Sequence, residues 1–188
     1  RSSAASDVYK RQILTVDVPK EEFLNKLKEI KEKYKENVKI IISKERRGKV
    51  SATNDAVKYS TGNILIFIDS DAIIEYINLE KVVEEINEYG LVEFYKEVIT
   101  KGWIGYMLHI EYSISYDIAL RILNKKHKAL TMNGAGFGVK REIWEKVNGY
   151  TRVYVEDIDF LFKAQEIGSK YYMTKDISCL LYTSPSPR

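Results

Sequence analysis

Carboxylates stand directly after one predicted strand and at the start of one predicted helix. Asp69 and Asp71 follow the apolar run Ile64–Ile68, and Glu156-Asp157 open a later helical segment. In an open α/β sheet, ligands bind beyond the carboxyl ends of the strands, which is where the first pair stands. Two carboxylates there can hold a hard divalent cation, which in turn binds phosphate oxygens. A carboxylate within reach of a hydroxyl can also act as a general base.

The Asp-x-Asp spacing carries little weight by itself, because an Asp after a strand often caps the following turn. Carboxylates at the start of a helix are likewise favoured by the helix dipole, whatever their chemistry. The segments around these acids therefore decide whether they form a site or a set of structural caps.

Strand and helix patterns alternate through the interior and predict an α/β fold. The predicted strands are Ile13–Val18, Val38–Ile42, Ile64–Ile68, Leu91–Ile99 and Lys170–Met173. The predicted helices are Pro19–Lys35, Lys49–Tyr59, Asn78–Tyr89, Trp103–Leu123, Arg141–Val147 and a last one from Glu156 that Gly168 ends. The nearly continuous apolar run Ile64–Ile68 predicts a central strand covered on both faces. The pattern as a whole predicts one mostly parallel, twisted sheet flanked by helices.

Both ends of the chain differ in composition from the interior. Residues 1–12 and 179–188 are rich in Ser, Pro and Arg and resemble translated adapter or vector sequence, whereas the interior is rich in Lys, Glu and Ile. We therefore expect one domain over residues 13–178, cut at both ends. Natural disordered tails are the alternative interpretation of the two flanks.

Charge and cysteine content exclude several classes of site. The chain has 30 basic and 27 acidic residues, but four of the basic and one of the acidic lie in the flanks, so the interior is formally neutral. The basic balance therefore gives no support to nucleic-acid binding. The single cysteine, Cys179, allows neither a disulfide framework nor a cysteine metal site, which fits a reducing compartment. His109 and His127 have no second His at ligand spacing, so we expect no His-based metal site.

Further motifs stand upstream and downstream of the acidic pair in a definite order. Gly48 directly precedes the predicted helix before the strand, and Lys49 and Asn54 lie in that helix. Downstream come Gly134–Arg141 (GAGFGVKR), Asn148-Gly149-Tyr150 and Glu156–Phe160 (EDIDF). In this order the motifs resemble those of the family 2 glycosyltransferases, which have the GT-A fold. The resemblance covers nearly the whole interior.

The resemblance implies roles for particular residues. Asp157 matches the catalytic base of the family, and Glu156 stands beside it in the same acidic motif. Asp71 matches the ligand of a Mn2+ or Mg2+ ion that bridges the donor diphosphate, and Asp69 lies near the ribose or the metal. The donor-binding residues that the resemblance implies are Asp17, Lys49, Asn54, Asp69 and Gly134.

The resemblance also implies a reaction: a metal-dependent, inverting hexosyltransferase that moves a sugar from a nucleotide-sugar donor, expected to be UDP-linked, to a carbohydrate or lipid-linked acceptor. Two departures concern the nucleotide pocket. Asp17-Val18 stands where the family has two acids, and the family's first strand has no counterpart before Ile13. We therefore expect little activity from the isolated chain.

Two other functions remain open. A sugar-nucleotide nucleotidyltransferase also places paired acids after a sheet strand, and it would release pyrophosphate. A non-catalytic nucleotide-binding module would bind a nucleotide without turnover.

The aromatic segment Trp103–Leu123 raises the question of membrane association in the full-length protein. Trp103 and Tyr106 are of the type that favours a bilayer interface, whereas Glu111 and Asp117 oppose a simple span. A helix packed on the sheet or over the acceptor cleft is the favoured interpretation. The expected location is the cytoplasm or the cytoplasmic face of the membrane.

Overall fold

The computed structural model describes residues 11–99 and 102–182. The chain divides into two compact units, residues 1–62 and 63–188, and each is described by itself.

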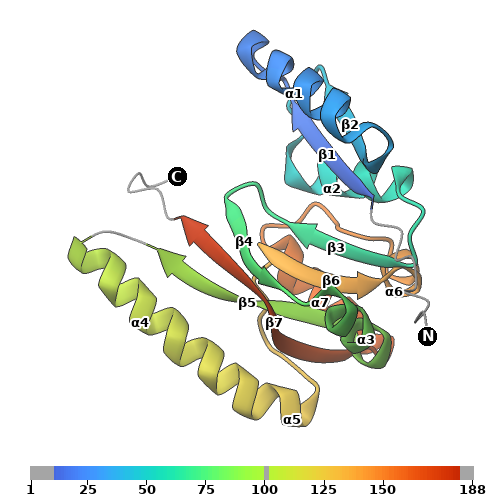
Figure 1. Ribbon diagram of the computed structural model, residues 1–188. Helices are drawn as coiled ribbons and strands as arrows, with labels where there is room; N and C mark the ends of the chain where they lie inside the picture. The colour runs from blue at the N-terminus through green and yellow to red at the C-terminus, as the bar shows by residue number, and fades with distance from the viewer. Residues whose placement is uncertain (1–10, 100–101, 183–188) are drawn as a thin grey trace, which may run out of the picture. The chain divides into compact units, whose positions relative to one another are not determined.

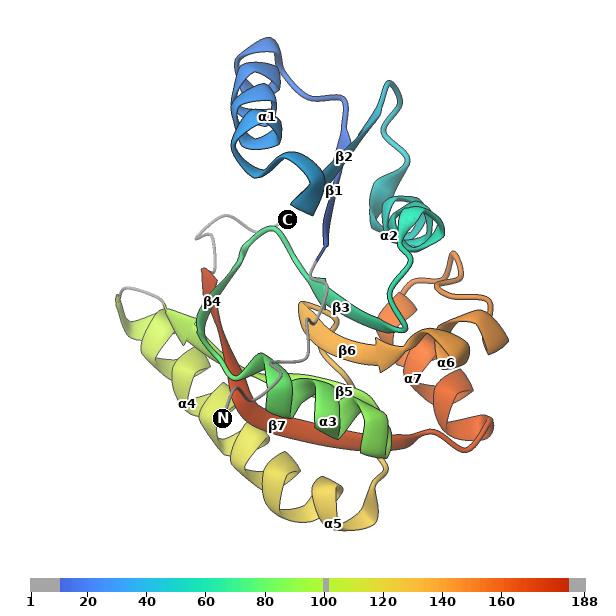
Figure 2. The same ribbon diagram turned by 45° about the vertical axis from the view of Figure 1, so that its right-hand side comes forward.

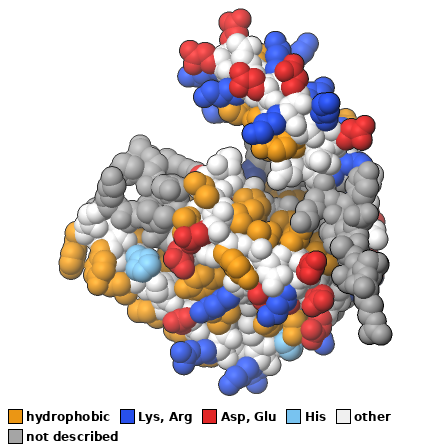
Figure 3. Space-filling view, viewed as in Figure 1, with side chains coloured by type: hydrophobic (Ala, Val, Ile, Leu, Met, Phe, Trp, Pro, Cys, Tyr) orange, Lys and Arg blue, Asp and Glu red, His pale blue; other side chains and the backbone are white. Residues whose placement is uncertain are grey.

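The first unit is built on two parallel strands (Figure 1). Strand β1 (Gln12–Asp17) pairs with β2 (Val38–Ser43) along its whole length. The connection consists of α1 (Glu21–Tyr34) and the 3-10 turn η1 (Lys35–Asn37), and α2 (Gly48–Tyr59) follows β2. Acids in the first turn of α1 and lysines in its last turn suit the helix dipole. Acidic and basic side chains are interspersed over this unit (Figure 3).

The second unit holds a five-stranded sheet in the order β3-β6-β5-β7-β4 (Figures 1 and 2). Its strands are β3 (Ile64–Ile68), β4 (Ala72–Ile77), β5 (Gly90–Ile99), β6 (Gly136–Lys140) and β7 (Lys170–Tyr182). Only β5 and β7 run parallel, and the other three pairings are antiparallel. The α/β class is thus as predicted, but the expectation of one mostly parallel sheet is wrong. Apolar periodicity reports burial and says nothing about the direction of the neighbouring strand.

Strand β3 differs from its predicted place at the centre of a sheet. It lies at an edge of the five-stranded sheet and pairs only with β6 among the described strands. Phe67 stacks on Phe137 and Trp144, with ring centroids 4.7 Å apart in both cases. Ile66 nevertheless remains 36% exposed, so the strand is not covered on both faces.

The helical segments of the second unit alternate with its strands along the chain. They are α3 (Leu79–Tyr89), α4 (Gly102–Ile118), the π-helical turn η2 (Ala119–Leu123), α5 (Asn124–Lys126), α6 (Arg141–Lys146) and α7 (Glu156–Glu166). Asn78 caps α3 by accepting the Lys81 N–H, and Gly90 ends it with a positive φ of 95°. The core cluster combines α3, β5 and β7, and its members are Val82, Ile86, Val92, Phe94, Ile177 and Cys179.

Helix α4 runs alongside β5, as Figures 1 and 2 show. Its Tyr116 is buried and lies against Tyr95 of that strand, with ring centroids 5.5 Å apart. This packing agrees with the interpretation of a helix placed on the sheet, although Trp103 is 74% exposed. Within residues 11–99 and 102–182, none of the helices has the length and apolar character that crossing a bilayer requires.

Strand β7 continues beyond Ser178, where the sequence analysis placed the end of the domain. Cys179 lies opposite Lys96 of β5 and is fully buried, and the strand ends only at Tyr182. The division of the chain into a domain over residues 13–178 and two flanks stays a prediction.

Candidate active site

Asp69 and Asp71 form a tight turn at the carboxyl end of β3, as the sequence predicts. The Asp69 N–H donates to the Ala135 carbonyl at 3.0 Å, which extends the pairing of β3 with the segment before β6. The Asp69 carbonyl accepts the Ala72 N–H at 3.1 Å and closes the turn. Asp69 is half-buried and Asp71 is exposed, so both carboxylates are within reach of a ligand from solvent.

Asp157 lies in the first turn of α7 and approaches the same segment from the other side. Its Oδ2 accepts the Gly134 N–H at 2.9 Å, and its Oδ1 accepts the N–H of Ile158 at 2.9 Å. A Cβ added at Gly134 would lie 3.0 Å from both the Cβ and the Oδ2 of Asp157. A side chain at position 134 would therefore push against Asp157, which gives the glycine assigned to donor binding a local packing reason as well.

Three carboxylates act on one buried phenol. Tyr150 is 3% exposed, and burial raises the pKa of its hydroxyl well above the ordinary range. The negative charges of Asp157, Glu156 and Asp69 raise that pKa further. The hydrogen bonds of Gly134 and Ala135 bring Asp157 and Asp69 to the same loop. In the sequence Tyr150 stands only as part of a turn motif, and its burial near these acids could not be predicted from that motif.

Asp159 makes different contacts from Asp157. It accepts hydrogen bonds from the Thr151 hydroxyl at 2.5 Å and from Lys163 Nζ at 2.7 Å. The bonds to Lys163 and Thr151 hold the pKa of Asp159 below its usual range. This residue belongs to an ion pair within α7, so it is a poor candidate for a base.

The remaining predicted donor-binding residues belong to the first unit. Asp17 Oδ2 accepts the backbone N–H groups of Arg47 and Gly48, at 2.9 and 3.0 Å, and so caps the start of α2. Lys49 and Asn54 lie on α2, the first exposed and the second half-buried. The structure gives Asp17 a structural role, and donor binding by these three residues stays a prediction.

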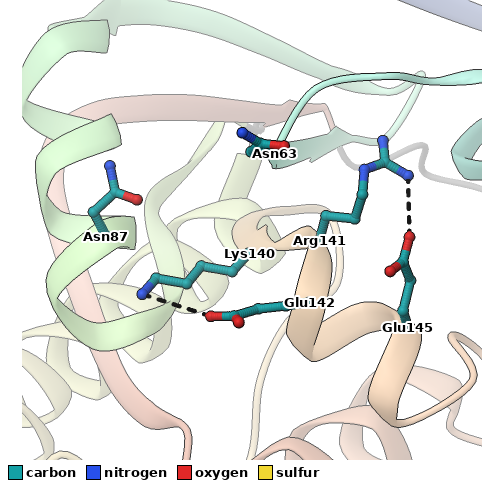
Figure 4. Close-up of a pocket in the computed structure, with 6 residues that line it drawn as sticks. All are labelled: Asn63, Asn87, Lys140, Arg141, Glu142 and Glu145. Atoms are coloured by element: carbon teal, nitrogen blue, oxygen red, sulfur yellow. Dashed lines mark ion pairs between the residues drawn. The ribbon is translucent and has the colours of Figure 1, made fainter.

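A pocket of about 420 Å³ lies away from these acids (Figure 4). It is polar and is lined by Asn63, Asn87, Lys140, Arg141, Glu142 and Glu145. Two ion pairs cross it, Lys140–Glu142 at 3.9 Å and Arg141–Glu145 at 3.7 Å. Asn63 precedes β3 whereas Asp69 follows it, and a five-residue strand spans about 17 Å. The pocket is therefore at the wrong end of the strand for the carboxylates.

The donor set suits a hard cation that a ligand helps to hold. Within the described part of the chain, no group of three or more His, Cys, Asp or Glu residues is arranged to bind a metal. Asp69 and Asp71 together offer two carboxylates at the end of β3. Magnesium-like ions are commonly bound by one or two protein carboxylates, with phosphate oxygens and water completing the shell. The residues present fit such a site.

Comparisons with solved structures show the fold. A mannosyltransferase, PcManGT from Pyrobaculum calidifontis, solved in complex with GDP-Man and Mn2+, is similar with a TM-score of 0.65 and 18% identity, over 90% of this chain and 47% of that one. GalNAc-T7, solved with UDP, GalNAc and Mn2+, is similar with a TM-score of 0.72 and 16% identity, over 93% of this chain and 38% of that one. The chain spans less than half the length of either. Both are GT-A glycosyltransferases, so the predicted GT-A fold is confirmed.

Sequence comparison identifies the family. No curated protein matches the chain. The profile described as "Glycosyl transferase family 2" matches residues 10–147, a range that includes Asp69, Asp71 and Gly134 and ends before Glu156 and Asp157. The match covers well over half of the chain and agrees with the resemblance seen in the motifs. The chain belongs to glycosyl transferase family 2.

Proposed function

We propose that the protein is an inverting glycosyltransferase that moves a hexose from a UDP-linked donor to the hydroxyl of a carbohydrate or lipid-linked acceptor. The observation that carries this proposal is the link between Asp157 and Asp69 at the carboxyl end of β3, where the Gly134 N–H donates to Asp157 and the next residue, Ala135, accepts the Asp69 N–H. The family supports glycosyl transfer, and the two solved structures support a nucleotide-sugar donor. A cytoplasmic location, or one at the cytoplasmic face of the membrane, is proposed from the resemblance alone.

Asp157 is the proposed general base. As the acceptor oxygen forms its bond to the anomeric carbon, the bond from that carbon to the diphosphate breaks, and the hydroxyl proton passes to Asp157. The nucleoside diphosphate leaves with the electron pair, and a single displacement inverts the carbon. The two backbone N–H groups on Asp157 hold the orientation of its carboxylate. Each carboxylate oxygen has a second lone pair, which remains for the acceptor hydroxyl.

Asp69 and Asp71 are the proposed ligands of Mn2+ or Mg2+. A cation bound there would offset the charge that builds on the departing diphosphate. Both solved relatives carry Mn2+, which favours manganese. Their nucleotides differ, GDP in one and UDP in the other, so the choice of UDP is tested by comparing both series of donors.

Replacing Asp157 tests the proposal. In the complete protein, Asp157→Asn should lower the rate of nucleoside diphosphate release by about 100- to 10,000-fold, the usual contribution of a general base. Calorimetry should show the affinity for UDP and Mn2+ nearly unchanged, since the metal ligands are elsewhere. A role in the helix dipole alone would change stability by about 0.3–1 kcal/mol and leave the rate intact.

Asp159→Asn is the matched control. It removes the same charge from the same turn of α7, but from a carboxylate that pairs with Lys163 and Thr151. The control should lose stability and keep most of its rate. Equal rates in the two variants, or an Asp157→Asn rate within about tenfold of the unmodified protein, would show that Asp157 is a helix-start residue.

A further inference from the structure

A buried ion pair lies next to the proposed site and belongs to none of the motifs. Glu93 and Lys96 of β5 have side chains that are 3% and 0% exposed, and Lys96 Nζ lies 3.0 Å from Glu93 Oε1. Residues three apart in a regular strand point to opposite faces. The pairing of β5 with β7 shifts between Phe94 and Tyr95, inside this interval, and such irregularities re-aim side chains.

Every polar contact that the structure gives the Glu93 carboxylate is internal. Its Oε1 also accepts the backbone N–H of Asn133 at 3.1 Å, and its Oε2 accepts the Tyr171 hydroxyl at 2.8 Å. Lys96 Nζ donates in addition to the Phe94 carbonyl at 3.0 Å. The carboxylate therefore connects the interior of the sheet to the loop that precedes β6.

That loop joins the two halves of the proposed site. Asn133 is held by Glu93, and the next amide, that of Gly134, donates to Asp157 at 2.9 Å. The following residue, Ala135, accepts the Asp69 N–H at 3.0 Å and donates its own N–H to Asn133 Oδ1 at 3.0 Å. Three consecutive residues thus contact Glu93, Asp157 and Asp69 in turn.

We propose that Glu93 is a positioning residue, which fixes the loop Asn133–Ala135 and through it the spacing of Asp157 and Asp69. This inference rests on the proposed function for its effect on the rate. A buried ion pair is a weak source of stability, because apolar residues of similar volume usually replace it without loss. The hydrogen bond from the Asn133 N–H to the Glu93 carboxylate explains the buried pair better. Since Asp157 is already bound to the loop by a single N–H, a shift of the loop moves the base relative to the metal ligands.

Three variants distinguish the effect of losing the hydrogen bond to the loop from the effect of a general loss of folding. Glu93→Gln with Lys96→Met removes both charges but keeps an oxygen for the Asn133 N–H and a donor for Tyr171. Glu93→Leu with Lys96→Met and Tyr171→Phe removes that oxygen and leaves no orphan hydroxyl. Tyr171→Phe alone is the control, because it removes a bond to the same carboxylate without touching the loop.

Two readouts are measured on the complete protein. The first is hydrogen exchange at the Asn133 and Gly134 amides, by mass spectrometry with residue-level fragmentation. The leucine variant should exchange Gly134 at least about tenfold faster, because loosening of the loop reaches the amide that holds Asp157. The second is nucleoside diphosphate release. The leucine variant should lose kcat by about tenfold or more with little change in KM for the donor, since misplacing a base affects the chemical step.

The glutamine variant and Tyr171→Phe should resemble the unmodified protein in both readouts. Unchanged Gly134 exchange in a folded leucine variant overturns the proposal, as does an equal loss of kcat in the glutamine variant. If Gly134 exchange rises as expected but the unmodified protein releases no nucleoside diphosphate from any UDP- or GDP-sugar, the positioning role stands and the proposed function fails.

Discussion

Adding one methyl group at Gly134 should displace the proposed base. The Cβ of Gly134→Ala would lie 3.0 Å from the Asp157 Cβ and Oδ2, whereas carbon atoms pack at about 3.5–4.0 Å. The Asp157 side chain or the loop must therefore move by a few tenths of an ångström. A displacement of about 1 Å costs on the order of a hundredfold in rate, so a shift of a few tenths should lower kcat by about three- to tenfold. The overpacking should also destabilise the fold by about 1–3 kcal/mol.

Gly136→Ala is the control for overpacking. Its Cβ would meet Cys179 Sγ and Phe94 Cδ2, both at 3.3 Å, in the core and away from Asp157. Thermal unfolding should show both variants destabilised, while nucleoside diphosphate release per folded molecule should fall mainly in Gly134→Ala. If the two variants lose rate alike, the close contact between Gly134 and Asp157 has no part in placing the base.

Three further outcomes are expected. Asp71→Ala should abolish the manganese dependence of UDP binding in calorimetry of the complete protein, and metal-dependent binding that survives would remove Asp71 from the cation site. Burial raises the pKa of Glu85, so its ionisation destabilises the folded state as pH rises above the pKa that this residue has in the unfolded chain. Glu85→Gln should therefore unfold at a higher temperature than the unmodified protein at pH 7. A difference in unfolding temperature that is no smaller at pH 4 would contradict this. The pKa of Asp159 is lowered instead, so its stabilisation is present at neutral pH and lost in acid; Asp159→Asn should be less stable by about 0.5 kcal/mol at pH 7, with the difference closing as pH falls below 4.

The bounds of a helix or strand were predictable where residues of that element itself mark its ends. Asn78 and Gly90 mark the ends of α3, and the apolar runs before Asp17 and Asp69 are strands within a residue or so of their predicted bounds. The direction and neighbours of those strands could not be predicted. They depend on which other strand offers free hydrogen-bonding groups, and a local pattern carries no information about that choice.

The acids of the candidate site were predictable because they stand at element boundaries, where motif order can be compared. Glu93 and Lys96 gave no comparable signal, since charges inside a strand are usually on its exposed face. Their burial follows from the irregularity in β5 and β7, which only the assembled sheet reveals. Asp17 shows the reverse case: a residue with a plausible ligand role that the structure uses, in part, to hold the first turn of α2.

The rate at which a reagent labels the Cys179 thiol measures how often the sheet opens. The thiol is completely enclosed between α3 and strands β5 and β7, and burial raises its pKa, so a thiol reagent cannot modify it while the core is closed. Because the chain has no other cysteine, the labelling rate reports a single event, the separation of the last strand from its neighbours. Labelling with and without nucleotide and manganese would then measure how strongly a ligand bound at the carboxyl end of β3 stabilises the pairing of β7 with its neighbours.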